Sequence, residues 1–170
     1  MMISIRAMCE KDIDTILLNY AEQGWSKPSE VLEKYLDGQR NNFLYVFVAE
    51  YNNDVTGYAI LYPDTEVGPF AFQKIPVISD LIVFEKYQRK GIGNKILDEA
   101  EKKASDLSDR VQLGVGLHSG YGSAQKLYIK RGYISDGTGV WYNDSHLEQY
   151  ADCKNDDGLV LFLVKALRVK

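Results

Sequence analysis

Apolar residues recur along the chain with two periods, and each period predicts a different kind of element. Alternating or continuous apolar runs, rich in aromatic and β-branched residues, predict strands. These are expected at residues 3–8, 43–51, 55–62, 77–84, 111–117, 139–142 and 159–164. Asn52-Asn53-Asp54 is typical of a tight turn, so the second and third strands should form a hairpin.

Apolar residues spaced three and four apart predict helices in the intervening segments. A first helix opens at residues 10–13 and closes at Gly24, and a second has Ser29 as its N-cap and ends at residues 41–42. A long helix follows Gly91, and a shorter one is expected at residues 123–130. The long helix should bury Ile92, Ile96, Leu97, Ala100, Ala104 and Leu107.

The order of these elements is β α α β β β α β α β β, which predicts the fold class. Strand–helix–strand units beside a hairpin imply an α/β protein with a mixed central sheet of about seven strands and helices on both faces. The chain has 170 residues, of which 45% are hydrophobic, and this is the size and composition of one domain over residues 1–170.

Composition excludes several classes of function. Lys plus Arg number 20 against 24 Asp plus Glu, and a net charge of −4 without a basic cluster argues against nucleic-acid binding. The longest apolar run, Phe43–Ala49, is far shorter than the roughly 20 residues of a membrane span, and the N-terminus lacks a secretory signal. Two cysteines and two histidines form no zinc-type spacing, so no metal is expected. A cytoplasmic protein is predicted.

The segment from Gln88 to Gly93 carries the clearest chemical signal. A predicted strand ends, the basic residues Arg89 and Lys90 follow, and Gly91 and Gly93 open the long helix. Glycines let backbone N–H groups approach a ligand, and a helix N-terminus carries unpaired donors and a positive dipole end. This combination suits a pyrophosphate. It is neither a P-loop nor the dinucleotide fingerprint, and a purely structural turn is the alternative.

Two motifs in this chain resemble the GCN5-related N-acetyltransferase (GNAT) family. Its members carry Gln/Arg-x-x-Gly-x-Gly/Ala after their fourth strand, which residues 88–93 fit. They also carry Ala-x-x-Leu-Tyr-x-x-x-Gly-Phe/Tyr on a later helix, matched here by Ala124, Leu127, Tyr128, Gly132 and Tyr133. The order of strands and helices is similar along nearly the whole chain. The resemblance implies a mostly antiparallel sheet that is splayed between strands 4 and 5.

The resemblance also implies how acetyl-CoA would bind. Its pyrophosphate would lie on Gln88, Arg89, Lys90, Gly91, Ile92, Gly93 and Asn94, and its pantetheine arm would pair with the backbone of Leu81, Ile82 and Val83. Such pairing needs unpaired strand groups, so a bulge is expected near Val83. Where family members often carry an asparagine that contacts pantetheine, this chain has Tyr121, and Ser123 or a backbone group is expected to replace that contact.

For catalysis, the resemblance implies direct attack by an amine on the thioester in a ternary complex. Tyr128 matches the position of the general acid that protonates the leaving thiolate. Asp80, in the fourth predicted strand, is the leading candidate for the base, and His118, at the end of the fifth, is a second candidate. Each of the three has a structural alternative: an amphipathic helix residue, a hydrogen-bonding carboxylate and a hydrogen-bonded histidine.

The acceptor is expected to be the primary amine of a small molecule. Residues 26–42, 63–76 and 143–157 are the candidate specificity segments, and the last is rich in Asp and Glu, which would attract a cationic amine. The alternatives are a non-catalytic acyl-CoA-binding module, a protein or peptide N-acetyltransferase, and transfer of a longer acyl chain. A homodimer that pairs through the last strand is also compatible with the sequence.

Overall fold

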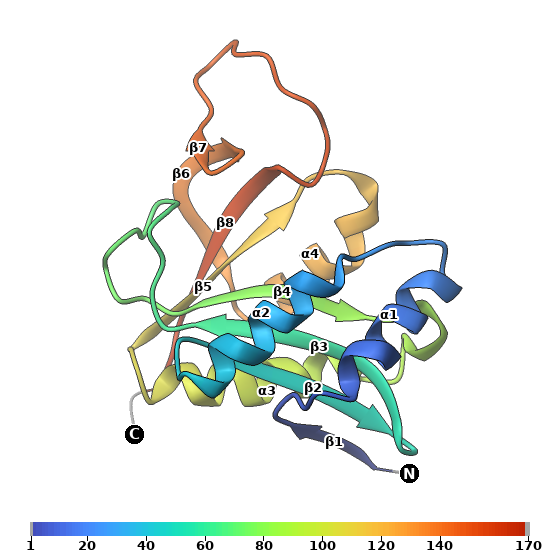
Figure 1. The fold of residues 1–170 in the computed structure, drawn as a ribbon. Helices are drawn as coiled ribbons and strands as arrows, with labels where there is room; N and C mark the ends of the chain where they lie inside the picture. The colour runs from blue at the N-terminus through green and yellow to red at the C-terminus, as the bar shows by residue number, and fades with distance from the viewer. Residues whose placement is uncertain (1, 169–170) are drawn as a thin grey trace. The chain divides into compact units, whose positions relative to one another are not determined.

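The computed structural model describes residues 2–168, so residues 1 and 169–170 of the predicted 1–170 domain lie outside the described part. Its elements, shown in Figure 1, run in the order β1 (Ile3–Arg6), α1 (Asp12–Glu22), α2 (Ser29–Arg40), β2 (Tyr45–Tyr51), β3 (Asp54–Tyr62), β4 (Val77–Val83), η1 (Glu85–Tyr87), α3 (Ile92–Ser105), β5 (Arg110–Gly116), η2 (Ser119–Tyr121), α4 (Gly122–Lys130), β6 (Ile134–Tyr142), β7 (Ser145–His146) and β8 (Leu159–Ala166).

The strands are hydrogen-bonded in the order β1-β2-β3-β4-β5-β8-β6-β7. The pairs β1–β2, β2–β3, β5–β8, β6–β8 and β6–β7 are antiparallel, whereas β4 and β5 are parallel. Along β4 and β5 the recorded register is the single pair Val77 and Gln112. The predicted α/β class, with a mixed, mostly antiparallel sheet splayed between β4 and β5, is therefore confirmed.

Three details of the sequence prediction are wrong. The last predicted residue of the α3 stripe, Leu107, is 40% exposed, because α3 ends at Ser105 and Leu107 lies in the turn that follows. Ser29 is the first helical residue of α2, and the N-cap is Pro28. The strand expected at residues 139–142 begins at Ile134, and its pairing with β8 is interrupted between Ser135 and Val140. Because of this interruption, apolar and polar residues do not alternate regularly along β6, and that alternation is the signal from which a strand is predicted.

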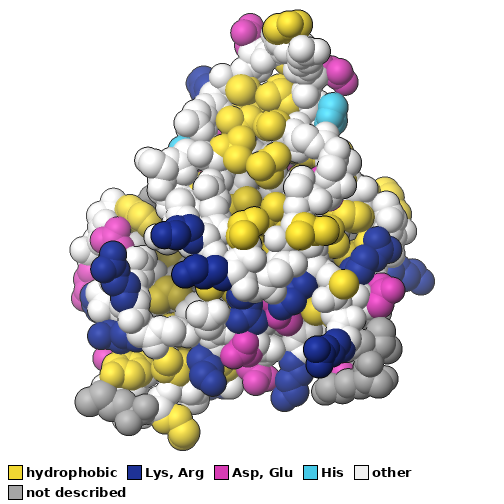
Figure 2. All heavy atoms as spheres, turned by 180° about the vertical axis from the view of Figure 1, so that it is seen from behind, with side chains coloured by type: hydrophobic (Ala, Val, Ile, Leu, Met, Phe, Trp, Pro, Cys, Tyr) yellow, Lys and Arg dark blue, Asp and Glu magenta, His cyan; other side chains and the backbone are white. Residues whose placement is uncertain are grey.

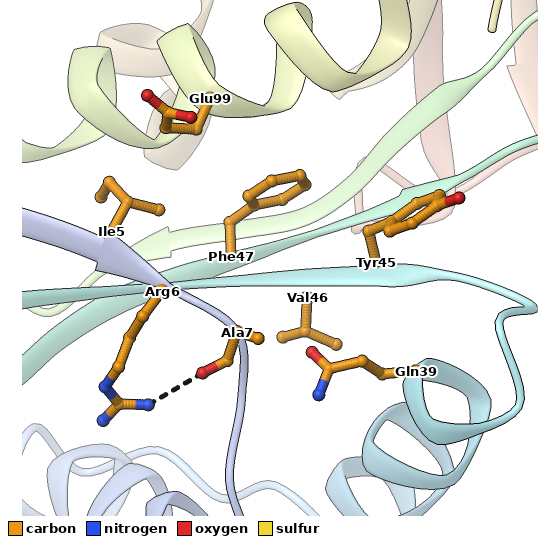
Figure 3. A pocket seen from close by; sticks show the side chains of 8 residues that line it. All are labelled: Ile5, Arg6, Ala7, Gln39, Tyr45, Val46, Phe47 and Glu99. Carbon is orange, nitrogen blue, oxygen red and sulfur yellow. Dashed lines mark hydrogen bonds between the residues drawn. The ribbon is translucent and has the colours of Figure 1, made fainter. Parts of the chain in front are cut away.

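The described residues form two compact units, and the first comprises residues 2–62 and 78–103. In this unit, α1 and α2 cover one face of β2 and β3, and their buried residues Ile16, Leu32 and Leu36 join Val46 and Val48 in a core cluster. The alternate residues of β2, Tyr45 and Phe47, point to the other face, where α3 lies, as Figure 3 shows. Side chains alternate between the two faces along β2, and each helix turns its apolar stripe toward one face, so apolar side chains pack on both faces of the sheet.

Both helices of this layer end in the same way. Gly24 has a positive φ of 75°, its N–H donates to the Ala21 carbonyl, and Trp25 N–H donates to the Tyr20 carbonyl at 2.9 Å. At the end of α2, Asn42 takes the same role with a φ of 60°. These are Schellman caps, in which a left-handed residue turns the chain away and satisfies the last helix carbonyls. The predicted helix ends at Gly24 and residues 41–42 are confirmed.

The hairpin between β2 and β3 turns through Asn52 and Asn53, which both have positive φ, as a type I′ turn requires. A register shift follows at Ala49 and Glu50, where Thr56 is the extra residue on β3. Its Oγ1 donates to the Ala49 carbonyl at 3.1 Å, and its own carbonyl accepts from Phe84 N–H at 3.0 Å. The bulge therefore also anchors the chain where β4 ends.

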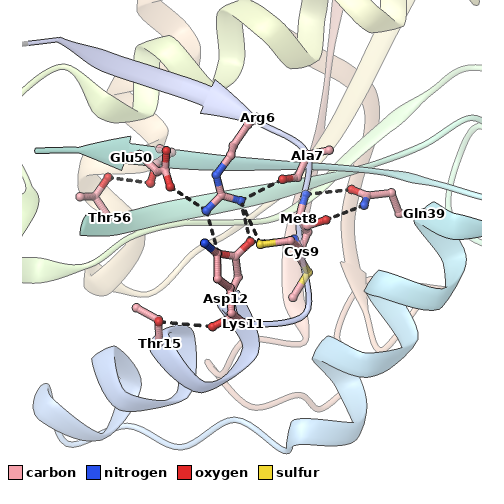
Figure 4. A network of polar contacts seen from close by, with 11 residues as sticks. Arg6, Ala7, Met8, Cys9, Lys11, Asp12, Thr15, Gln39, Glu50 and Thr56 are labelled. Carbon is pink, nitrogen blue, oxygen red and sulfur yellow. Dashed lines mark hydrogen bonds and ion pairs between the residues drawn. The ribbon is translucent and has the colours of Figure 1, made fainter. Parts of the chain in front are cut away.

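An ion-pair network fixes β1 against α1, as Figure 4 shows. The Arg6 guanidinium donates to both oxygens of Asp12, at 2.7 and 2.8 Å, and to Glu50 at 2.7 Å. The Asp12 carboxylate also accepts from the backbone N–H of Cys9 at 2.7 Å. Burial acts to raise the pKa of Asp12, but the hydrogen bonds from Arg6 and Cys9 outweigh it and lower that pKa. Asp12 therefore stays ionised although it is 2% exposed.

The second unit comprises residues 63–77 and 104–168 and is built on the antiparallel pairs β5–β8 and β6–β8. On one face of this sheet the rings of Trp141 and Phe162 meet edge to face, with centroids 5.6 Å apart. Seen from behind, hydrophobic side chains gather in the upper part of the view in Figure 2.

Candidate functional site

Strand β4 carries an unusual backbone conformation in the middle of its run. Asp80 has a φ of 49°, in the left-handed region, although it lies inside a strand. The bulge that the sequence predicts near Val83 stays a prediction, and the irregular backbone of this strand lies at Asp80. The next residues, Leu81, Ile82 and Val83, are half-buried. Their partly exposed backbone is the segment expected to pair with an extended ligand arm.

The segment Gln88–Gly93 forms the turn that the sequence predicts. Positive φ values at Arg89 (61°) and Gly91 (79°) fold the backbone tightly just before α3 begins at Ile92. The Gln88 side chain donates to the Val83 carbonyl at 3.0 Å, so this residue ties the turn to the end of β4. Positive φ at every second residue resembles an anion-binding nest, in which successive N–H groups point to one side.

The surroundings of this turn fit a negatively charged group. A Cβ added at Gly91 would meet no atom within 4 Å, so the space beside the backbone is open. Arg89, Lys90 and Asn94 are exposed, and the first turn of α3 holds no acidic residue. Ile92 is 1% exposed and packs in the core, so only its backbone is available to a ligand. These residues can hold a pyrophosphate by backbone N–H groups, the helix dipole and two cations.

The predicted base Asp80 is the centre of a polar cluster. One of its oxygens, Oδ2, is paired with the Lys27 ammonium and accepts hydrogen bonds from Tyr58 at 2.9 Å and Tyr35 at 3.1 Å. The Tyr58 hydroxyl is also 2.9 Å from that of Tyr20. A hydrogen-bonded carboxylate is the structural alternative for Asp80, and its bonds come from the α1–α2 connection, α2 and β3, while Tyr20 of α1 reaches Asp80 only through the Tyr58 hydroxyl.

The tyrosines of this cluster are neutral donors. Burial, reinforced by the Asp80 charge, raises the pKa of Tyr35 and Tyr58, and burial raises that of Tyr20 to about 12. At neutral pH the three phenols therefore keep their protons beside the ion pair of Asp80 and Lys27. The charge of the cluster is balanced only while an ammonium lies beside Asp80.

Tyr128 lies on α4 in the second unit, where the motif Leu-Tyr-x-x-x-Gly-Tyr has a clear structural role. Gly132 has a φ of 91° and ends the helix, and Tyr133 N–H donates to the Tyr128 carbonyl at 3.1 Å. The two tyrosine rings pack with centroids 5.7 Å apart, which is the apolar contact typical of a Schellman cap. Tyr128 is 6% exposed, and burial raises the pKa of its phenol to about 12.

His118, the second candidate base, has both ring nitrogens engaged. Its Nδ1 accepts from Gly120 N–H at 3.1 Å, so the proton lies on Nε2, which donates to Asp157 at 2.9 Å. Tyr121 donates to the same carboxylate oxygen at 3.1 Å. The hydrogen bond from His118, followed by that from Tyr121, lowers the pKa of Asp157 although burial opposes it. Ser123 is exposed on the first turn of α4.

Comparison with known proteins gives a family match. The model of the acetyltransferase (GNAT) family matches residues 11–133. The chain belongs to this family. The comparison with curated proteins gives no match.

Solved GNAT structures share the fold along the whole length of the chain. A ribosomal-protein-alanine N-acetyltransferase from Brucella melitensis has a TM-score of 0.71 and 21% identity, covering 96% of this chain and 99% of that one. The protein yncA from Salmonella typhimurium, solved with its cofactor acetyl-CoA, has a TM-score of 0.70, 18% identity and coverage of 99% and 95%. The paia N-acetyltransferase from Thermoplasma acidophilum, in complex with coenzyme A, has a TM-score of 0.69, 17% identity and coverage of 98% and 99%.

Some residues of the polar clusters were not found from the sequence. Lys27, Tyr20 and Tyr58 carry no local signal, because each meets Asp80 or its neighbours only through the fold, across sequence separations of 22 to 53 residues. Asp157 belongs to the acidic segment that was expected to attract a cation, but its particular pairing with His118 could not be predicted. The one signal near Lys27 is Pro28, which favours an extended backbone before it.

A further pocket lies away from these residues. It has a volume of about 230 Å³ and lies between β1, β2 and α3 in the first unit, where Figure 3 shows Ile5, Phe47, Tyr45 and Glu99 around it. None of the predicted site residues lines it. Within residues 2–168, no three His, Cys, Asp or Glu side chains are grouped as metal ligands, and no helix is long and apolar enough to cross a membrane.

Proposed function

We propose that this GNAT protein is an N-acetyltransferase that moves the acetyl group of acetyl-CoA to a primary amine of a small molecule, with residues 1–170 acting as one domain. The observation that carries the proposal is the open turn at Gln88–Gly93, with its positive φ values and flanking cations. A cytoplasmic location and a homodimer stay predictions.

The chain would hold acetyl-CoA through backbone groups. The N–H groups of residues 89–94 and the charges of Arg89 and Lys90 would bind the pyrophosphate. Gln88 would hold the turn in place through the hydrogen bond from its side chain to the Val83 carbonyl. The backbone of Leu81, Ile82 and Val83 would pair with the pantetheine arm as an added strand. Ser123 is the proposed substitute for the asparagine that relatives use. No step requires a metal ion.

Tyr128 is the proposed general acid. In the reaction a C–N bond forms, the C–S bond breaks, and the sulfur takes a proton. A phenol with a pKa of about 12 is fully protonated at neutral pH, so it is ready to donate. Complete transfer to a thiolate of ordinary pKa near 8.5 would be uphill by about 5 kcal/mol. Tyr128 therefore acts best by donating a hydrogen bond to the sulfur while the C–S bond is breaking, and the departing thiolate takes its proton from solvent while Tyr128 keeps its own.

Asp80 is the proposed proton acceptor for the amine, with His118 as the alternative. For His118 to accept a proton, its Nδ1 must first give up the hydrogen bond from Gly120. Asp80 already interacts with an ammonium, that of Lys27, and an amine in the same place would have its proton beside a carboxylate oxygen. This geometry favours Asp80.

The test is a thiol-release assay with acetyl-CoA across a panel of primary amines, combined with the variant Tyr128→Phe. We expect turnover with at least one free amine, and a loss of roughly 10²-fold in kcat for Tyr128→Phe with coenzyme A affinity unchanged. Tyr45→Phe is the matched control, because Tyr45 lies on β2 and lines the pocket that none of the proposed site residues lines. An unchanged kcat in Tyr128→Phe would refute its role.

The same assay separates the alternatives. Binding of coenzyme A without turnover against any amine would favour a non-catalytic acyl-CoA-binding module. Faster reaction with peptide N-termini than with any free amine would favour a protein acceptor, a possibility that the similarity to a ribosomal-protein-alanine N-acetyltransferase supports at the level of fold. Faster reaction with propionyl- or succinyl-CoA would indicate a longer acyl chain.

A further inference from the structure

Lys27 lies among three tyrosine rings and one carboxylate, all within the first unit. Its Nζ is 5.5 Å from the ring centroid of Tyr20, 5.8 Å from that of Tyr35 and 5.6 Å from that of Tyr58. Each distance lies within the roughly 6 Å of a cation–π interaction. The same nitrogen pairs with Asp80. We refer to Tyr20, Tyr35, Tyr58 and Asp80 as the tyrosine cage.

The cage has the features of a site that recognises a primary ammonium. The ring faces attract a cation, and the carboxylate oxygen Oδ2 supplies an acceptor for N–H donors. Tyr58 is 1% exposed and Tyr20 is 6% exposed, whereas Tyr35 is half-buried, so two of the three rings are closed off from solvent. Without Lys27, the cage would contain one half-buried carboxylate with no positive charge beside it among its four residues.

The backbone of Asp80 indicates that the carboxylate is held in place at a cost. A positive φ in a non-glycine residue is uncommon, and it is strained where the surroundings enforce it. Such strain concentrates at ligand and active sites. The conformation directs the Asp80 side chain to the two tyrosine hydroxyls and the ammonium.

We propose that the tyrosine cage is a binding site for a primary alkylammonium group, which Lys27 fills in the free protein and which the ammonium of the acceptor amine takes over. The identification of the incoming amine as the acceptor rests on the proposed acetyl transfer. The binding site itself does not.

Lys27 is placed to leave the cage. It lies in the connection between α1 and α2, outside any helix or strand, and its neighbour Trp25 is 52% exposed. The Lys27 side chain is 15% exposed and that of Asp80 is 23% exposed, so the pair lies at the edge of the core and not deep inside it. Rotation of a flexible four-carbon stem is sufficient to open the site. An incoming ammonium then restores the charge balance that Lys27 provided.

The cage also defines the chemistry of its ligand. A primary ammonium can lie over the ring faces and still donate a hydrogen bond to Asp80, as the ammonium of Lys27 does. A quaternary ammonium has no N–H group, so it would leave Asp80 without a donor. An unbranched stem is required at the entrance, because that is the shape that Lys27 has there. Butylammonium is therefore the matched probe, and tetramethylammonium is the matched control ligand.

The experiment is an NMR titration of the protein with butylammonium chloride in the absence of acetyl-CoA. We expect Lys27→Ala to bind the probe at least about 10-fold more tightly than the wild type, because the competing side chain is gone. Lys27→Ala combined with Asp80→Asn should lose this binding, and tetramethylammonium should bind at least about 10-fold more weakly than butylammonium. Lys11→Ala, at the exposed N-cap lysine of α1, should behave as the wild type.

The proposal is overturned if folded Lys27→Ala, still able to bind coenzyme A, binds butylammonium no better than the wild type. It is also overturned if tetramethylammonium binds equally well. Lys27→Gln replaces Lys27→Ala if the alanine variant fails to fold. Failure of acetyl transfer would be seen separately, as absent thiol release in a protein whose cage still binds butylammonium.

Discussion

Gly57→Ala tests how closely the bulge on β3 approaches the end of β4. A Cβ at position 57 would lie 2.3 Å from the Ile82 carbonyl oxygen and 3.1 Å from the Val83 Cα. Both neighbours are backbone, so they cannot rotate away as a side chain could. Ordinary contact begins near 3.4 Å, so β3 and β4 must separate by about 1 Å at this point.

The expected cost is that of overpacking a core, about 1–3 kcal/mol. For a chain of this length the melting temperature should fall by roughly 2–12 °C. Because the displaced backbone is that of Ile82, which is proposed to pair with pantetheine, the KM for acetyl-CoA should also rise, by roughly 2- to 10-fold for one weakened hydrogen bond. Thermal denaturation followed by circular dichroism gives the first quantity, and thiol-release kinetics give the second.

Gly122→Ala is the control for this experiment. A Cβ there meets no atom within 4 Å, and the residue is helical, so alanine should leave stability unchanged or raise it by about 0.5–1 kcal/mol. If Gly57→Ala were as stable as the wild type, the close approach of β3 to β4 would be disproved. If it lost stability but kept its KM, the approach would stand and the pairing of Ile82 with pantetheine would be refuted.

Three other predictions follow from contacts described above. Asp12→Asn should lower the free energy of unfolding by about 2 kcal/mol. The loss is smaller than for a fully buried ion pair, because the Arg6 side chain is partly exposed and its charge stays partly hydrated. Because the pKa of Asp12 is lowered on folding, its contribution is present above pH 4 and is lost as the pH falls further, so urea titrations of wild type and variant should converge in acid. Gly132→Ala should cost about 1 kcal/mol, measured by urea titration, because its φ is 91°. The kcat should not fall between pH 7 and 10 through loss of the Tyr128 proton, since that pKa is about 12; a decline that disappears in Tyr128→Phe would contradict this.

Much of the fold was predictable because its signals are local. The Schellman caps at Gly24 and Asn42 and the turn at Asn52-Asn53 are set by residues that tolerate positive φ, and these stand out in a sequence. Leu107 was misplaced because helical spacing continues past the point at which α3 ends. The start of β6 was missed because its irregular pairing with β8 breaks the period of two.

The candidate site was predictable only where a motif lies within one turn or helix. Gln88–Gly93 and Tyr128 belong to such motifs, and their local geometry explains the spacing of the motif residues. The tyrosine cage is different, because it joins α1, the α1–α2 connection, α2, β3 and β4. No period or spacing in a single sequence reports which lysine will meet which aspartate over such separations. Asp80 was found as a carboxylate on β4, but its partners required the fold.

The Gly132 cap affects how the tyrosine motif should be read in other sequences. The glycine and the second aromatic residue stop α4 and bring Tyr133 against Tyr128, and they do so whether or not any bond is broken nearby. Selection for a stable helix C-cap alone would preserve the same motif residues in a related protein that no longer catalyses a reaction. The spacing of these residues therefore predicts a capped helix, and it does not by itself show acetyl transfer.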